Sequence, residues 1–192
     1  RDRGADVVLI AARVAIPLPD GVEVTRVATV AELQSALDKA LLPPPNGAAA
    51  PLADLYVSAA AVSDFRVAGG PSSEKLRRDG PLTLHLEPTP DLLAGIATSL
   101  GPRANRTTKL IGFSAESGAT TRAAEKLKAK DLDLIVANDV GAPGIGFESE
   151  QNAVEVLHVD GSSERIGPAP KRVVADRILD HAVRLLRGRT SA

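Results

Sequence analysis

The chain has 192 residues, which makes one domain the natural expectation, and 44% of them are hydrophobic, which is enough for a core. That core must be aliphatic, because the chain contains three Phe, one Tyr and no Trp. A net charge of −1 gives no global field that would attract nucleic acid or an anionic membrane, and the absence of Cys excludes disulfides, thiolate metal sites and a thiol nucleophile.

No targeting or membrane segment is evident in the sequence. No apolar run approaches the roughly 18 residues that a membrane span needs, and no signal-peptide pattern opens the chain. We therefore expect a cytoplasmic protein that binds neither nucleic acid nor a membrane. The chain has no Met and begins at Arg1, so we also expect a further segment upstream of it.

Strands and helices are predicted to alternate along the chain. Short apolar runs between turn residues indicate strands, and apolar residues at helical spacing indicate helices. The predicted strands are 6–11, 22–27, 55–57, 83–86, 109–113 and 134–137. The predicted helices are 31–41, a helix opened by 89–91, 120–130 and 171–186. Segments 153–159 and 163–166 form a predicted antiparallel pair about the turn dipeptide Asp160-Gly161.

This order predicts an α/β protein, namely a three-layer Rossmann-like fold with a mostly parallel sheet and a late antiparallel hairpin. Two helix starts carry capping signals. Thr29 and Glu32 have the spacing of a capping box. Residues 89–91 provide a capping hydroxyl, a proline at the first helical position and an early acid.

The segment 54–78 changes abruptly from apolar to charged residues. Its strand at 55–57 is predicted to be buried on both faces of a parallel sheet. Small residues at 58–62 follow, and then Asp64, Arg66 and Lys75. Ligands of open α/β sheets bind at the carboxyl ends of strands, so this segment is a candidate site. By composition alone, a solvated, charged loop is the favoured interpretation.

Five short motifs follow one another in order along the chain. They are AAAVSDF (59–65), EK (74–75), TPDLLAG (89–95), GFSAES (112–117) and LIVANDV (134–140). Together they resemble the phosphopantothenoylcysteine synthetase family, the nucleotide-dependent half of bifunctional coenzyme A biosynthesis proteins. The similarity runs from about Gly4 to Leu186. It implies that residues 1–192 form one such domain, which lacks the amino-terminal strand, Gly-rich loop and helix of the family.

The resemblance implies a ligase that joins 4′-phosphopantothenate to L-cysteine at the expense of CTP. In this reaction the carboxylate attacks the α-phosphate, pyrophosphate leaves, and the cysteine amine displaces CMP from the acyl cytidylate. The family also implies Mg²⁺, a homodimer, and fusion to or association with a flavin-dependent phosphopantothenoylcysteine decarboxylase domain.

Several residues match family positions that contact the nucleotide. Lys126 and Lys130 are four residues apart and share a helix face, where lysines are ordinarily solvated; the resemblance places them on the triphosphate. It assigns Asp64 to CTP, either directly or through a divalent metal ion, and Lys75 to nucleotide binding and catalysis. The remaining nucleotide-binding residues that it implies are Glu87, Pro88, Thr89, Pro90 and Phe113.

Asn138 and Asp139 follow a predicted buried strand, and they are candidates for substrate binding. They can equally form only local hydrogen bonds to the backbone. The three histidines, His85, His158 and His181, are scattered through the sequence, and we expect structural or surface roles for them.

Two other functions are compatible with the pattern. The α/β alternation favours a Rossmann-type nucleotide-binding oxidoreductase, but the sequence has no G-x-G-x-x-G motif. The second alternative is a non-catalytic α/β assembly domain.

Overall fold

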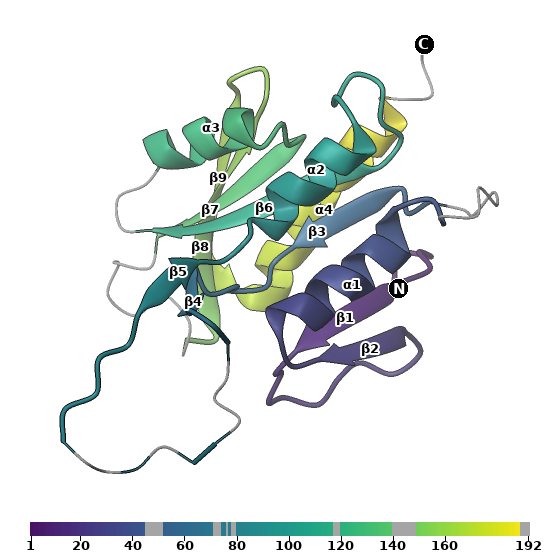
Figure 1. Cartoon of the computed structure of the whole chain (residues 1–192). Coiled ribbons are helices and arrows are strands. Elements are labelled where there is room, and N and C mark those ends of the chain that lie inside the picture. The colour runs from purple at the N-terminus through teal and green to yellow at the C-terminus, as the bar shows by residue number, and fades with distance from the viewer. Residues whose placement is uncertain are drawn as a thin grey trace. The chain divides into compact units, whose positions relative to one another are not determined.

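The computed structural model describes residues 1–44, 52–70, 74–75, 77, 80–116, 120–139 and 149–188 (Figure 1). The chain divides into two compact units. Unit 1 contains Arg1–Ala36 and Ala60–Leu92, and unit 2 contains Leu37–Ala59 and Leu93–Ala192. Most of the proline- and alanine-rich connector at 42–51 lies outside the described residues.

Unit 2 is built on a five-stranded sheet with the order β3-β6-β7-β8-β9. The pairs β3–β6 and β6–β7 are parallel, whereas β7–β8 and β8–β9 are antiparallel. This sheet confirms the predicted α/β fold with its late hairpin. The strands are β3 (Leu55–Ser58), β6 (Lys109–Glu116), β7 (Leu134–Asp139), β8 (Gln151–His158) and β9 (Ser163–Pro170).

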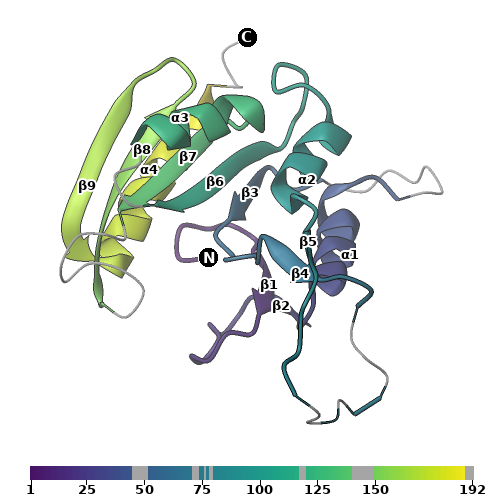
Figure 2. The same ribbon diagram turned by 60° about the vertical axis from the view of Figure 1, so that its left-hand side comes forward.

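Helices cover both faces of this sheet, which gives unit 2 its three layers (Figures 1 and 2). The helix α4 (Lys171–Arg187) packs on one face. The helices α2 (Leu92–Leu100) and α3 (Thr120–Ala129) lie over the other face. The core under α4 consists of Ile111, Leu134, Val136, Val154, Val156, Ile166, Val174, Ile178 and Ala182.

The alternation of side chains along β6 decides which layer each residue meets. Ile111 belongs to the core under α4, so Phe113 points to that face as well. Gly112 and Ser114 point to the α2/α3 face. A Cβ atom on Gly112 would lie 2.7 Å from the Leu132 side chain, so glycine is needed for this close approach.

The strand β3 departs from its prediction. A strand buried on both faces was expected at 55–57, but Val57 is 39% exposed and the rest of β3 is half-buried. Within the sheet of unit 2, β3 is an edge strand, so it has a neighbouring strand on one side only. An apolar run therefore did not distinguish an edge strand from a central one.

Unit 1 begins with a parallel pair, β1 (Val8–Ala12) and β2 (Glu23–Val27), followed by the start of α1 (Val30–Leu41). The predicted capping box is confirmed. The Glu32 N–H donates to Thr29 Oγ1 at 3.1 Å, and the Thr29 N–H donates to Glu32 Oε2 at 3.3 Å. Local sequence thus fixes the start of α1.

Unit 1 also contains an antiparallel ribbon that the sequence did not reveal. The strands β4 (Phe65–Val67) and β5 (Leu86–Pro88) pair with each other. The strand predicted at 83–86 overlaps β5 only at Leu86, and β4 was not predicted. Each strand has three residues, too few for a recognisable hydrophobic period.

Candidate nucleotide site

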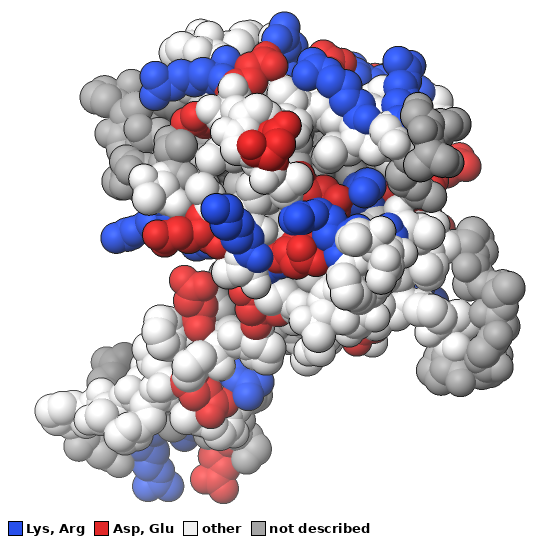
Figure 3. Space-filling view, turned by 90° about the horizontal axis from the view of Figure 1, so that it is seen from above, with Lys and Arg blue, Asp and Glu red and all other residues white. Residues whose placement is uncertain are grey.

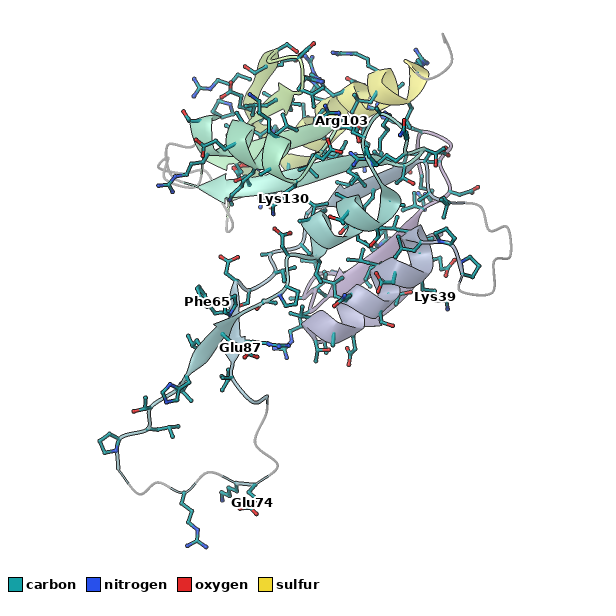
Figure 4. All side chains as sticks on the ribbon, turned by 45° about the horizontal axis from the view of Figure 1, so that its top comes forward. Lys39, Phe65, Glu74, Glu87, Arg103 and Lys130 are labelled. Atoms are coloured by element: carbon teal, nitrogen blue, oxygen red, sulfur yellow. The ribbon has the colours of Figure 1, made fainter. Side chains whose placement is uncertain are left out.

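The predicted nucleotide-binding residues on the β4–β5 ribbon of unit 1 lie on two opposite faces of that ribbon. Phe65, Arg66 and Val67 pair with Pro88, Glu87 and Leu86, and the Thr89 N–H donates to the Asp64 carbonyl at 2.9 Å. Alternation therefore puts polar and apolar side chains on opposite faces, and Figure 4 shows Glu87 and Phe65 on opposite sides of the ribbon. We call Asp64, Arg66, Glu87 and Thr89 the polar face, and Phe65, Val67, Leu86 and Pro88 the apolar face.

Three predicted nucleotide-binding residues, Asp64, Glu87 and Thr89, thus share the polar face. Pro88 lies on the apolar face, so its side chain is separated from these three. Pro90 follows Thr89 directly and lies before α2. The structure therefore brings together three of the six predicted nucleotide-binding residues of unit 1.

Glu87 has an unpredicted partner on the polar face. Arg66 Nε donates to Glu87 Oε1 at 2.8 Å, and the two side chains are 60% and 42% exposed. Thr89 Oγ1 is buried without a hydrogen-bond partner in the described structure. The polar face therefore presents a cation beside two carboxylates, whereas the unsatisfied Thr89 hydroxyl is buried beneath it.

Lys75 lies in the connection between β4 and β5, and it is exposed. This location agrees with the loop position expected for Lys75.

In unit 2, the two predicted phosphate-binding lysines have different surroundings. Lys126 Nζ donates to Ser114 Oγ at 3.3 Å, and Ser114 is buried near the carboxyl end of β6. Lys130 follows the end of α3 and lines a cavity of about 350 Å³ between α2 and α3. Figure 4 shows its place at the end of the helix. The cavity is also lined by Ala94, Ala97, Thr98, Gly101, Pro102, Ala129 and Asp131.

Phe113 and Asn138 lie on the α4 face of the sheet, whereas Ser114 and Lys126 meet on the α2/α3 face. Phe113 is 38% exposed. Asn138 pairs with Ala115 of β6 and with Val154 of β8, and its Oδ1 atom is buried without a hydrogen-bond partner in the part of the chain that the structure describes. Asp139 ends β7, but its side chain lies outside the described structure.

Charges are mixed over the surface. Figure 3 shows Lys and Arg interspersed with Asp and Glu on the face that it draws. Within the described ranges, no group of three or more His, Asp or Glu side chains could hold a metal ion. Among the described helices, none is long and apolar enough to cross a membrane.

Mg²⁺ nevertheless fits the polar face, because in nucleotide sites it is commonly held by one or two carboxylates together with substrate phosphates. Asp64 is exposed and can supply one such carboxylate. Glu87 is less suitable, since Arg66 already occupies one of its oxygens.

Two residues of this arrangement received no role from the sequence: Arg66, named only as part of the charged segment, and Ser114. Arg66 lies two residues after Asp64, so a period-2 count through the segment would have placed both on one face, had a strand been expected there. Ser114 is part of the motif at 112–117, but only the contact with Lys126 singles it out.

The chain is similar to proteins of known families along almost its whole length. The family model described as "DNA/pantothenate metabolism flavoprotein C-terminal domain" matches residues 1–186. The coenzyme A biosynthesis bifunctional protein CoaBC of Mycobacterium tuberculosis (strain ATCC 25618 / H37Rv) is 37% identical over 199 residues, which cover 98% of this chain and 45% of that protein. CoaBC of Escherichia coli (strain K12) is 30% identical over 182 residues, covering 92% of this chain and 41% of that protein.

Solved structures support the fold. The C-terminal domain of a CoaBC protein superimposes with a TM-score of 0.72 at 24% identity, covering 97% of this chain and 78% of that chain. The DNA/pantothenate metabolism flavoprotein from Streptococcus pneumoniae gives a TM-score of 0.71 at 18% identity, with coverages of 96% and 83%. The chain spans less than half the length of the curated relatives named above.

Proposed function

Because the chain belongs to the family of DNA/pantothenate metabolism flavoprotein C-terminal domains, we propose that it acts in coenzyme A biosynthesis as a CTP-dependent phosphopantothenate–cysteine ligase. The observation that most supports this proposal is the similarity to CoaBC proteins over nearly the whole chain. The five motifs in sequence order support the finer assignment to the ligase step.

The proposed reaction gives a carboxylate the leaving group that it lacks. The carboxylate oxygen of 4′-phosphopantothenate attacks the α-phosphorus of CTP, and pyrophosphate leaves with the electron pair of the broken P–O bond. The cysteine amine then attacks the acyl carbon of the cytidylate. The C–O bond breaks, CMP leaves, and the nitrogen loses a proton to give the amide.

The residues of this chain would align the substrates and offset phosphate charge. We assign Lys75, Lys126 and Lys130 to the phosphates, where cations interact more strongly as charge develops on the leaving group. The Ser114 hydroxyl holds the Lys126 ammonium near the end of β6, which supports a positioned rather than a freely moving charge. Asp64 would hold Mg²⁺, which when bound offsets further phosphate charge.

Asn138 is the proposed contact for an acyl or amino substrate. Its buried Oδ1 lacks a donor in the described structure, and an unsatisfied buried acceptor costs stability unless a ligand or water supplies an N–H or O–H. Both 4′-phosphopantothenate, through its amides, and cysteine, through its amine, carry such donors. Phe113, at 38% exposure, would offer an apolar contact to the nucleotide.

Two partners complete the proposal. A second copy of the chain would cover the apolar face, where Phe65 is 57% and Leu86 59% exposed. The match covers less than half of each bifunctional relative, which leaves room in those proteins for a second activity and supports a decarboxylase domain as a fused or associated partner.

The proposal is tested by measuring ligase turnover in the wild type and CTP binding in two variants of helix α3. With 4′-phosphopantothenate, cysteine, CTP and Mg²⁺, the protein should release CMP and pyrophosphate in equal amounts with the amide product. Lys126→Ala should weaken CTP binding by about tenfold or more, since a charge-assisted contact is lost. Lys128→Ala, an exposed lysine of the same helix, should change it less than about twofold.

Calorimetric titration with CTP, ATP and NADH compares the alternatives directly. Binding of NADH in place of CTP would favour the oxidoreductase. A folded protein that binds none of the three would favour the assembly domain. Equal effects of Lys126→Ala and Lys128→Ala on CTP affinity would refute the role given to Lys126.

A further inference from the structure

Arg66 is the cation of the polar face, and the residues around it are acidic or polar. Asp64 lies two residues before it on the same face, Glu87 is its direct cross-strand neighbour, and Thr89 lies beside Asp64. The ladder that holds these side chains extends past both strands, because the Ala68 N–H donates to the His85 carbonyl at 2.8 Å. Arg66 therefore lies within a paired stretch of backbone.

The guanidinium of Arg66 is bound to Glu87 through its Nε atom, whereas its two Nη atoms are available to a ligand. Its Nε–H donates to Glu87 at 2.8 Å, whereas Nη1 and Nη2 make no hydrogen bond or ion pair with the residues that the structure describes. An arginine has five N–H donors, so four remain, and they form a planar fork. With the side chain 60% exposed, that fork is accessible to a ligand.

Glu87 restricts Arg66, and Arg66 offsets the charge of Glu87. A bare carboxylate on this face would repel a phosphate, but a carboxylate paired with a guanidinium does not add net negative charge. The fork of an arginine matches two oxygens of a phosphate, a geometry that lysine does not offer.

We propose that Arg66 is a further phosphate-binding residue and that Glu87 is its positioning residue. The inference rests on the proposed function, since the phosphate would come from CTP or from the 4′-phosphate of the acyl substrate. It changes the role of Glu87, whose side chain acts through Arg66 and does not itself contact the nucleotide.

The experiment separates phosphate binding from every other contribution to affinity. Binding of cytidine, CMP, CTP, pantothenate, 4′-phosphopantothenate and pyrophosphate is titrated for the wild type, Arg66→Ala and Arg66→Lys in the presence of Mg²⁺. Arg26→Ala serves as the control, because Arg26 is an exposed arginine on β2 of the same unit.

We expect Arg66→Ala to weaken CTP binding about tenfold, with cytidine binding unchanged. Arg66→Lys should recover part of the loss, because it restores the charge but not the fork. Arg26→Ala should leave all affinities within about twofold. If 4′-phosphopantothenate loses affinity while pantothenate and CTP do not, Arg66 binds the phosphate of the acyl substrate.

A cross-strand ion pair that only stabilises the ribbon would behave differently. Arg66→Ala and Glu87→Ala would then lower the melting temperature equally, and ligands with and without phosphate would lose affinity by the same factor. That result would overturn the inference. If the wild type binds neither CTP nor 4′-phosphopantothenate, the proposed function fails instead, and the pyrophosphate titration alone decides the role of Arg66.

Discussion

Asp133 lies immediately before β7, at the opposite end of the parallel strands β6 and β7 from Ser114. It is 3% exposed and accepts hydrogen bonds from Arg106 Nη2 at 2.8 Å, Lys109 Nζ at 3.1 Å and the Leu110 N–H at 2.9 Å. The Arg106 side chain is 1% exposed, so its positive charge must be compensated by nearby carboxylates. The buried Asp133 carboxylate lies 2.8 Å from it, and the half-exposed Asp131 carboxylate lies 3.5 Å away. This cluster has a structural role.

Asp133→Asn should therefore destabilise the fold strongly. It removes the charge that compensates a buried guanidinium, and breaking a buried ion pair typically costs about 3–5 kcal/mol. Asp131→Asn is the matched control, because that side chain is 45% exposed and should cost about 1 kcal/mol or less. Urea unfolding measures both, and equal losses would contradict the role given to burial.

His158 and His181 form a hydrogen-bonded pair between β8 and α4. His158 Nε2 lies 2.8 Å from His181 Nδ1, and His181 is 2% exposed with Nε2 3.2 Å from Glu164 Oε2. The expectation of structural or surface histidines thus agrees with the structure for this pair. His85 is exposed. Burial, and then the nearby His158, lower the pKa of His181 below its ordinary value.

The stability of the protein should consequently fall as the pH drops below about 6.5, the ordinary pKa of histidine. The unfolded chain takes up a proton at His181 more readily than the folded chain does, so acid favours unfolding. A hydrogen bond from Arg177 lowers the pKa of Glu164, and the stability that this provides is lost in still stronger acid. His181→Gln should reduce the pH dependence of the free energy of unfolding between pH 7.5 and 5.5, whereas His85→Gln should leave that dependence unchanged. Unchanged slopes in both variants would contradict this role.

At the scale of elements, Gly167 allows β9 to stay paired with β8 across a shift in the register of the two strands. Pairing shifts between Asn152 and Val154, and Gly167 has a φ of +93°. A Cβ atom at this position would lie 2.4 Å from the Asn152 carbonyl oxygen, which is backbone and cannot move aside easily. Both the conformation and the space therefore require glycine.

Gly167→Ala should accordingly cost about 2 kcal/mol or more, because the strain of a positive φ adds to a backbone clash. Gly161→Ala in the turn of the same hairpin is the control. Its φ is +87°, but a Cβ atom there would meet nothing within 4 Å, so only the conformational strain remains. Thermal unfolding compares the two, and a larger loss for Gly161→Ala would refute the clash.

Several features defined by neighbouring residues could be predicted from the sequence, although the capping hydroxyl expected at Thr89 makes no hydrogen bond in the described structure. The capping box at Thr29 and the turn at Asp160-Gly161 depend on contacts within a few positions, and both occur as expected. The ribbon depends on a partner about 20 residues away, so its strands carried no local signal. Its register then decides which side chains share a face, so the sequence named Arg66 in a charged segment but did not pair it with Glu87.

At the scale of the whole molecule, the predicted site residues are divided between the two units. Asp64, Lys75 and residues 87–90 belong to unit 1, whereas Phe113, Lys126, Lys130 and Asn138 belong to unit 2. The order of the five motifs indicated the family, but it did not show that the site residues belong to two compact units. A motif also does not specify the face of a sheet on which a side chain lies. The resemblance therefore assigned both Phe113 and Lys126 to the nucleotide, although Phe113 lies on the α4 face of the sheet and Lys126 on the α2/α3 face.

Self-association through the apolar face is a property of the whole molecule. Phe65→Ser and Leu86→Ser should shift sedimentation toward the monomer, because each removes exposed apolar surface from the proposed contact. Val173→Ser is the control, since Val173 is 48% exposed on α4. A dimer that resists both ribbon substitutions, or dissociates equally in the control, would place the interface elsewhere.

The outer strand of the sheet in unit 2 has a consequence for behaviour at high concentration. β9 carries Pro168 and Pro170, which have no N–H to donate, and the exposed charged residue Arg165. Unprotected sheet edges are templates on which strands of other molecules add, and they lead to aggregation. An edge interrupted by prolines and a charge cannot continue the ladder, so sheet growth from one molecule to the next should stop at β9.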